Sequence, residues 1–195
     1  MSALTHLVFD IETLGNRSNA VCLSLACVPF VFEESCSFEE YFQKGFYVKF
    51  NPIEQLKSGR TTEKDTLLWW KKQSKEALEV TKPSSIDVDM VTGLNQLSAF
   101  IKSTNYNFKQ SYNWCRAQDF DFPIMSDLYR QNGLEVPYNR WNNRDIKTYV
   151  DILTGSKNGY FNMKFQPPVD MVKHNALCDC VMDIMRMKEI YDSCI

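Results

Sequence analysis

The sequence of 195 residues predicts an α/β fold, in which a mixed β-sheet carries helices on both faces. Apolar runs typical of strands open the chain at 4–10, 20–32 and 47–50, and a short polar turn separates the first two. Segments with apolar residues at helical spacing follow, and they alternate with one further strand-like run at 109–114. Strands in succession, then helices and strands in alternation, are typical of a sheet that is covered on both sides.

The first three strands are predicted to form a meander. The turn residues Gly15-Asn16-Arg17-Ser18 join the first apolar run to the second. The run Tyr47-Val48-Lys49-Phe50 alternates in polarity and ends at Asn51-Pro52. It therefore fits a third strand that follows the second.

Two helices are predicted next. Thr61 or Thr62 can cap a helix that runs through TEKDTLLWWKKQSKEAL (62–78), and acidic residues occupy its first turn. Lys82-Pro83-Ser84-Ser85 then breaks the chain. A second helix is predicted over 88–103, because apolar residues recur there at helical spacing: Val91, Leu94, Leu97 and Ile101.

The second half of the chain is predicted to be mainly helical. The strand Lys109–Trp114 precedes a helix over Phe122–Gln131, which ends at Asn132-Gly133. A helix over Asp145–Leu153, a polar loop over Thr154–Phe165 and a final helix over Asn175–Tyr191 complete the prediction.

Composition limits the classes of protein to which the chain can belong. With 44% hydrophobic residues and no apolar stretch of about 18 residues, the chain is expected to form one globular domain over 1–195 that does not span a membrane. The N-terminus lacks a signal-type segment, and the seven cysteines are odd in number and lack C-x-x-C pairs. We therefore expect a cytoplasmic protein with reduced thiols. A net charge of −2 indicates that any contact with nucleic acid is local.

Two carboxylates lie close together in the motif Phe9-Asp10-Ile11-Glu12, directly after the first apolar run. Side chains two residues apart on a strand point to the same face, so Asp10 and Glu12 repel one another there. One interpretation is a solvated strand edge. The other is a divalent cation between the two groups, since sites rich in carboxylate oxygen suit Mg²⁺ or Mn²⁺.

Further candidate ligands occur at two later positions. Asp121 follows a predicted strand and opens a helix, where it could also be an ordinary helix cap near Pro123. His174 and Asp179 are five residues apart, so within one helix their side chains would diverge by about 140°. They converge only if His174 precedes the helix. Otherwise they are a loop histidine and an acidic residue on a helix surface.

The combined motif D-x-E, F-D and H-x-x-x-x-D resembles the DEDDh branch of the DnaQ-like 3′→5′ exonucleases, which have a ribonuclease H-like fold. The segments WWKKQSKEA, NWCRAQDFDFPIMSDL, WNNRDIKT and HNALCDCVMDIMRMK are similar to the exonuclease A family of tailed phages. The resemblance implies release of mononucleotides from the 3′ end of single-stranded DNA, in the host cytoplasm if a phage encodes the chain. Because the wider group contains exoribonucleases and oligoribonucleases, RNA remains an alternative substrate.

The resemblance also implies two Mg²⁺ or Mn²⁺ ions in the active site. Asp10 would bridge both ions, Glu12 and Asp179 would complete one, and Asp121 would hold the other. His174 would act as the general base. Its pKa is expected to be raised by the nearby carboxylates and lowered by bound metal.

Substrate contacts are expected around Thr13 and Leu14, at Arg116 and in the predicted helix 62–78. The resemblance implies that backbone groups around Thr13 and Leu14 meet the terminal nucleotide. Arg116 could contact a phosphate or could be solvated surface. Asp183, one turn after Asp179, could support the metal ligands, but as an acid on the helix surface it is rather expected to be a bystander. A homodimer is possible, but the sequence identifies no interface.

The tryptophans of the predicted helix 62–78 are ambiguous. Trp69 and Trp70, with Gln73 close by, could belong to the core, as tryptophans on amphipathic helices usually do. They could instead stack on a nucleobase. Both interpretations stay open at this point, with Trp70 and Gln73 as candidate substrate contacts.

Overall fold

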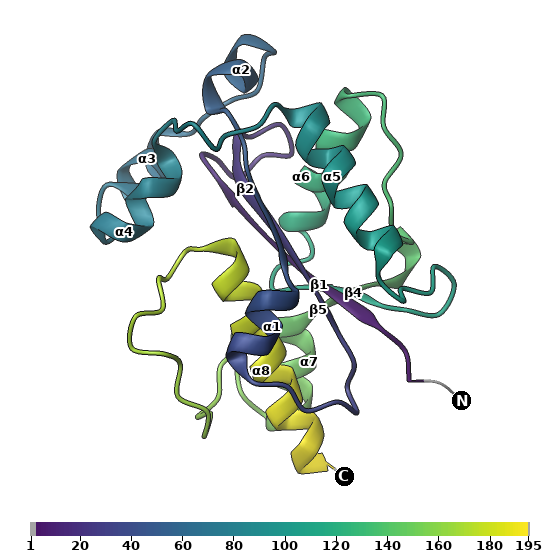
Figure 1. Ribbon diagram of the computed structural model, residues 1–195. Coiled ribbons are helices and arrows are strands. Elements are labelled where there is room, and N and C mark those ends of the chain that lie inside the picture. Colours follow the sequence, from purple (N-terminus) through teal and green to yellow (C-terminus); the bar gives the residue numbers. More distant parts are fainter. Residues whose placement is uncertain (1–2, 195) are drawn as a thin grey trace.

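The computed structural model describes residues 3–194 and is built around a mixed five-stranded sheet (Figure 1). The strand order is β3-β2-β1-β4-β5. The central strand β1 pairs antiparallel with β2, which pairs antiparallel with β3, while β4 and β5 run parallel to β1. The predicted mixed sheet and meander are therefore confirmed. The strands are β1 (His6–Thr13), β2 (Cys22–Phe30), β3 (Phe46–Lys49), β4 (Asn113–Cys115) and β5 (Asn143–Asp145).

The alternation of side chains along β1 separates two layers of helices. Leu7, Phe9 and Ile11 pack with α5 (Met90–Ser103) and α6 (Asp121–Gln131). On the other face, Val8 packs with three helices (Figure 1): α1 (Phe38–Lys44), α7 (Ile146–Thr154) and α8 (Ala176–Cys194). Since side chains on a strand alternate, Asp10 and Glu12 share the face of Val8. This register directs both carboxylates toward α8.

Three short helices stand outside these two layers (Figure 1): α2 (Pro52–Lys57), α3 (Lys64–Trp70) and α4 (Lys75–Leu78), the last followed by the 3₁₀ turn η1 (Glu79–Thr81). The predicted single helix over 62–78 is wrong, because the chain leaves the helix after Trp70. The Ser74 hydroxyl accepts a hydrogen bond from the Ala77 amide and caps the second piece. The break lets Trp70 and Ala77 join one small core with Leu14, Val21 and Leu23.

Besides η1, four elements were not predicted. The helix α1 begins with a capping box between Ser37 and Glu40, which the sequence already carries as S-x-x-E. Asn51 caps α2 and Pro52 opens it, although this pair was interpreted only as a strand end. The three-residue strand β5 and the 3₁₀ turn η2 (Arg140–Asn142) are too short to show a periodic pattern. No helix within residues 3–194 has both the length and the apolar character needed to cross a bilayer.

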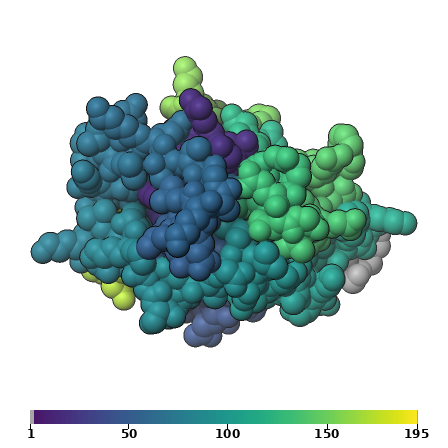
Figure 2. Space-filling view, turned by 90° about the horizontal axis from the view of Figure 1, so that it is seen from above, coloured from purple at the N-terminus to yellow at the C-terminus, as the bar shows by residue number. Residues whose placement is uncertain are grey.

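The buried side chain of Arg60 ties the α2–α3 connection to the rest of the molecule. In Figure 2 the blue segment around residues 50–60 lies beside the green segment that follows α6, with part of the purple N-terminal segment next to both. Arg60 is 4% exposed and donates four hydrogen bonds of 2.8–3.1 Å. The acceptors are the Ser18 and Ala20 carbonyls, Asp127 and Gln131.

We expect Arg60→Ala to lower the free energy of unfolding by about 3 kcal/mol. The Asp127 carboxylate would stay buried with Arg130 as its remaining basic partner. The matched control is Arg130→Ala. Arg130 also pairs with Asp127, but its side chain is 74% exposed, so we expect a loss below about 1 kcal/mol. Urea unfolding followed by circular dichroism measures both values. Equal losses would contradict the role given to Arg60.

Candidate active site

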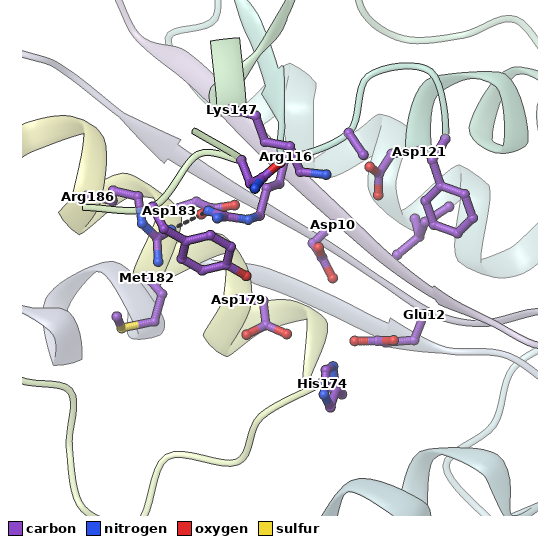
Figure 3. Close-up of a pocket in the computed structure, with 15 residues that line it drawn as sticks. Asp10, Glu12, Arg116, Asp121, Lys147, His174, Asp179, Met182, Asp183 and Arg186 are labelled. Carbon is purple, nitrogen blue, oxygen red and sulfur yellow. Dashed lines mark hydrogen bonds and ion pairs between the residues drawn. The ribbon is translucent and has the colours of Figure 1, made fainter. Parts of the chain in front are cut away.

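Four carboxylates from three elements converge at one end of the sheet (Figure 3). Asp10 and Glu12 come from β1, Asp121 is the first residue of α6, the helix that follows β4, and Asp179 lies in the first turn of α8. All four line one cavity of about 430 Å³. Within residues 3–194, none of the four is held in an ion pair with a lysine or arginine. The structure therefore brings together the acidic residues that the sequence singled out.

His174 reaches the same place because it precedes α8. Its backbone has φ of +60°, a left-handed conformation that a residue other than glycine rarely adopts. The Asn175 side chain accepts hydrogen bonds from the Leu177 and Cys178 amides and so caps the helix directly after His174. One possible ligand atom each of Glu12, His174 and Asp179 lies within 4.8 Å of the others. His174 thus precedes the helix that carries Asp179, as the convergence of the two side chains requires.

Two tryptophans hold the imidazole from the α3 side. The Trp69 ring meets His174 edge to face, with ring centroids 4.7 Å apart, and the Trp70 ring lies 6.3 Å away at a similar angle. Trp69 is 41% exposed, whereas Trp70 is 2% exposed. The indole N–H of Trp70 donates to the Thr13 carbonyl at 2.8 Å. The core interpretation therefore holds for Trp70, and its predicted role in base stacking is corrected: only Trp69 has the exposed ring surface that stacking requires.

Burial and mutual repulsion change the acidity of the carboxylates. Burial, followed by repulsion from Glu12, Asp121 and Asp179, raises the pKa of Asp10 well above its ordinary value. The pKa of Glu12 is raised well above its usual range for the same reasons. Burial also raises the pKa of Asp121 and that of Asp179 to about 7. The cluster thus favours a positive charge, which bound protons or a cation can supply.

The pKa of His174 is lowered from its ordinary value of 6.5, first by burial and then by the positive charge of Lys173. The expected raising of this pKa by neighbouring carboxylates is therefore wrong. Desolvation of the ring, which packs against Trp69, is the first cause of the lowered pKa. The imidazole is consequently neutral near neutral pH and can accept a proton.

The donor set of this cluster fits a divalent cation. Carboxylate oxygens from Asp10, Glu12, Asp121 and Asp179 predominate, and His174 is the one imidazole among the residues that line the cavity. Hard cations such as Mg²⁺ and Mn²⁺ prefer such oxygen ligands. Buried carboxylates without a basic partner are costly unless a cation neutralises them. The residues that could hold a metal are therefore these four carboxylates, with His174 as a further possible ligand beside Glu12 and Asp179.

Arg116 lines the same cavity, but its hydrogen bonds go to residues other than the four carboxylates (Figure 3). Its guanidinium donates to Asp183 at 2.9 Å and to the Gly159 carbonyl at 2.7 Å. Asp183 is 4% exposed and also pairs with Arg186. The expectation that Asp183 is a bystander on the helix surface is wrong, because it faces the cavity and fixes two arginines there. Contact of Arg116 with a phosphate stays a prediction.

The remaining predicted substrate contacts lie around Thr13. The Leu14 amide donates to the Val21 carbonyl at 2.9 Å, and its own carbonyl accepts from the Glu63 amide at 2.8 Å. The Leu14 N–H is therefore already engaged within the fold, and contacts of Thr13 and Leu14 with a nucleotide stay predictions. Gln73 donates to the Trp69 carbonyl at 3.0 Å and lines a neighbouring cavity beside His174.

Two aromatic residues at this site were not singled out from the sequence. Phe120, directly before Asp121, lies between the main cavity and a second one. Tyr160 reaches the main cavity from the connection between α7 and α8. The sequence did contain a signal for Phe120, because this residue belongs to the F-D motif. No signal in the sequence pointed to Tyr160, because a tyrosine in a polar, glycine-containing loop is usually only a surface residue.

Comparison with known proteins identifies the family. The profile of the 3′-5′ exoribonuclease Rv2179c-like domain matches residues 5–191. This chain belongs to that family. An exodeoxyribonuclease of Enterobacteria phage T4 is 32% identical to this Rv2179c-like chain over 200 residues, which cover 93% of the chain and 86% of the phage protein. The resemblance to phage DEDDh exonucleases that the motifs predicted is confirmed at this level.

Solved structures confirm the fold of this Rv2179c-like domain. An E. coli ExoI–ssDNA complex in its zinc-bound form matches with a TM-score of 0.61 at 10% identity, over 97% of this chain and 41% of that one. The nuclease domain of 3′hExo, a DEDDh family member bound to rAMP, matches with a TM-score of 0.60 at 10% identity, over 99% of this chain and 94% of that one. The ribonuclease H-like fold predicted from the motifs is therefore present.

Proposed function

We propose that this protein is a metal-dependent 3′→5′ exonuclease that hydrolyses single-stranded DNA from the 3′ end and releases mononucleotides. The observation that carries the proposal is the convergence of four carboxylates from β1, α6 and α8 with His174. A buried group of acids without basic partners fits the binding of cations and of the phosphate that those cations attract.

Two ions would be held by this group. Asp10 would contact both, Glu12 and Asp179 would complete the first, and Asp121 would hold the second. When bound, divalent cations neutralise charge at the phosphate and make a water molecule a nucleophile near neutral pH. The chain's own contribution is to fix its carboxylates in place before the substrate arrives, from two strand positions and the first turns of two helices.

His174 would take the proton from the attacking water. The lowered pKa leaves its ring neutral, and the edge-to-face contact with Trp69 restricts its orientation. The left-handed backbone at His174 brings the ring toward Glu12 and Asp179. A positioned general base typically accelerates hydrolysis by about 10²–10⁴-fold.

The 3′-terminal nucleotide would occupy the second cavity, which has a volume of about 390 Å³ and adjoins Glu12. Thr13 lines this cavity, where its backbone would meet the 3′-hydroxyl. Trp69 and Phe120 supply aromatic surface for the base. Seating of one chain end in this cavity would favour exonuclease over endonuclease activity.

The preference for DNA is supported by the likeness to the T4 exodeoxyribonuclease. Because the family description names an exoribonuclease, matched DNA and RNA strands of one sequence must be compared. We expect kcat/KM for the DNA strand to exceed that for the RNA strand. A higher value for RNA would replace the proposal by a 3′→5′ exoribonuclease with the same site.

The raised carboxylate pKa values predict how stability depends on pH. The folded protein without metal holds protons on Asp121 and Asp179 up to about pH 7, whereas the unfolded chain releases them near 3.8. Folding therefore takes up protons in this window, and stability falls as the pH rises. We expect the Tm in EDTA to fall between about pH 5 and pH 8.

Mg²⁺ or Mn²⁺ should remove most of this loss, because a bound cation replaces the protons. The rise in Tm on adding metal should therefore be larger at pH 8 than at pH 5. Thermal unfolding across pH, with and without metal, measures the effect. A metal-induced rise that is independent of pH would contradict binding at these carboxylates.

A further inference from the structure

Tyr160 stands at the edge of the carboxylate cavity with most of its side chain open to solvent. It is 63% exposed and lines the same cavity as Asp10, Glu12 and Asp179. An exposed aromatic ring beside a catalytic cluster is a natural surface for a planar ligand. The established fold and the motifs assign no role to this residue.

The backbone before Tyr160 is fixed in place. Gly159 has φ of +69°, its amide donates to Asp151 at 2.8 Å, and its carbonyl accepts from Arg116 at 2.7 Å. A β-carbon at this position would lie 2.8 Å from the Lys147 Cα atom, so the loop contacts α7 where only glycine fits. Tyr160 therefore projects from an anchored turn.

Two arginines support the ring of Tyr160. The guanidinium carbon of Arg116 lies 4.2 Å from the ring centroid, and that of Arg186 lies 5.8 Å from it. Both guanidinium groups are held by Asp183, which is buried in α8. A guanidinium over an aromatic ring is a favourable contact that orients the ring. The ring is thus preorganised while much of its surface stays accessible.

The main cavity, which the four carboxylates line together with Arg116 and Tyr160, adjoins the second cavity, and the two share Ile11, Glu12 and Phe120. Within the main cavity, Glu12 lies toward the cavity of Thr13 and Trp69, while Arg116 lies on the other side of Asp10 (Figure 3). A strand that crosses the carboxylates must therefore place one nucleotide in each cavity. If the 3′-terminal nucleotide sits beside Thr13, its 5′-phosphate lies over the carboxylates and the penultimate nucleotide faces Tyr160.

We infer that Tyr160, held by Arg116 and Arg186, stacks on the base of the penultimate nucleotide, which stays on the strand after cleavage. The inference rests on the proposed exonuclease function. During hydrolysis the water oxygen joins the phosphorus of the released nucleotide, and the bond from phosphorus to the O3′ atom of the penultimate nucleotide breaks. That O3′ leaves and takes up a proton. Stacking holds the leaving sugar in register with the carboxylates.

The test compares two single-stranded oligothymidylates of six residues. One has a base at every position, and the other carries an abasic tetrahydrofuran residue at the penultimate position. We expect the wild-type protein with Mg²⁺ to release the terminal nucleotide from the first with a kcat/KM roughly 5- to 100-fold higher, the usual effect of one base–aromatic stack. Tyr160→Ala should reduce this ratio to near one, and Tyr160→Phe should retain it.

Trp69→Ala is the matched control, because Trp69 is a partly exposed aromatic residue of the opposite cavity. It should lower kcat/KM for both strands and retain their ratio. Tyr160→Ala with an unchanged ratio would overturn the inference, as would a wild-type ratio near one. If the wild-type protein releases no 3′ nucleotide from the complete strand or its RNA counterpart, the proposed function fails as well. If the wild-type protein is active but does not distinguish the complete strand from the abasic strand, only the inference about Tyr160 fails.

Discussion

Asp10→Asn should reduce the single-turnover rate of strand hydrolysis by about 10³-fold or more, the largest effect that we expect from one substitution. Burial and four neighbouring carboxylates raise the pKa of Asp10 well above its ordinary range, so Asp10 lies at the centre of the cluster. Asparagine keeps the shape of the side chain but removes its charge. Calorimetry with Mn²⁺ should show weaker binding or fewer bound ions.

The same substitution should not damage the fold. Because a neutral amide replaces a carboxylate that repels its neighbours, we expect the Tm in EDTA at pH 8 to stay equal or to rise. Asp119→Asn is the matched control, since Asp119 is exposed and only two residues before Asp121. The control should keep activity and metal binding. Near-normal turnover of Asp10→Asn would show that the metal assignment is wrong.

The site was largely predictable because its residues recur in a fixed order with characteristic spacings. The D-x-E pair on a buried strand placed two charges on one face, and the geometry of a helix required His174 to precede α8. The structure meets that requirement through the left-handed backbone at His174 and the cap at Asn175. What sequence could not supply was the environment of the imidazole, because its lowered pKa depends on burial against a ring more than 100 residues away.

Elements whose form depends on tertiary contacts were not predicted. The helix predicted over 62–78 breaks after Trp70 because the Trp70 indole bonds to the Thr13 carbonyl and packs beside Leu14. The strand β5 is three residues long and exists through its pairing with β4. Asp183 resembles an ordinary surface acid in the sequence, because its partner Arg116 lies 67 residues away.

His174→Ala and Asp179→Ala should both abolish most activity but for different reasons. Asp179→Ala should weaken Mg²⁺ or Mn²⁺ binding together with the rate, because a ligand is lost. His174→Ala should keep most of the affinity for metal and for the strand, while the single-turnover rate falls by roughly 10²–10⁴-fold. Calorimetry beside single-turnover kinetics separates the two residues.

The pH dependence gives an independent check on His174. Protonation removes a general base, so the wild-type rate should fall as the pH drops through the lowered pKa of His174. The variant His174→Ala should lose this contribution. His174→Asn is a further control, because asparagine tolerates the left-handed backbone but cannot act as the base. If His174→Asn restored the rate, or His174→Ala lost metal as severely as Asp179→Ala, the assignment as a base would fail.

We expect the carboxylate cluster, with bound divalent metal, to remove nucleotides one at a time from a free 3′ end. The most direct measurement follows a 5′-labelled linear single strand of DNA and a circular single strand of the same composition, each with Mg²⁺ or EDTA. We predict a ladder that shortens by single nucleotides from the 3′ end with Mg²⁺, no reaction in EDTA and an intact circle. Rapid cutting of the circle would show that the protein is an endonuclease. An undiminished reaction in EDTA would show that hydrolysis does not need a divalent metal.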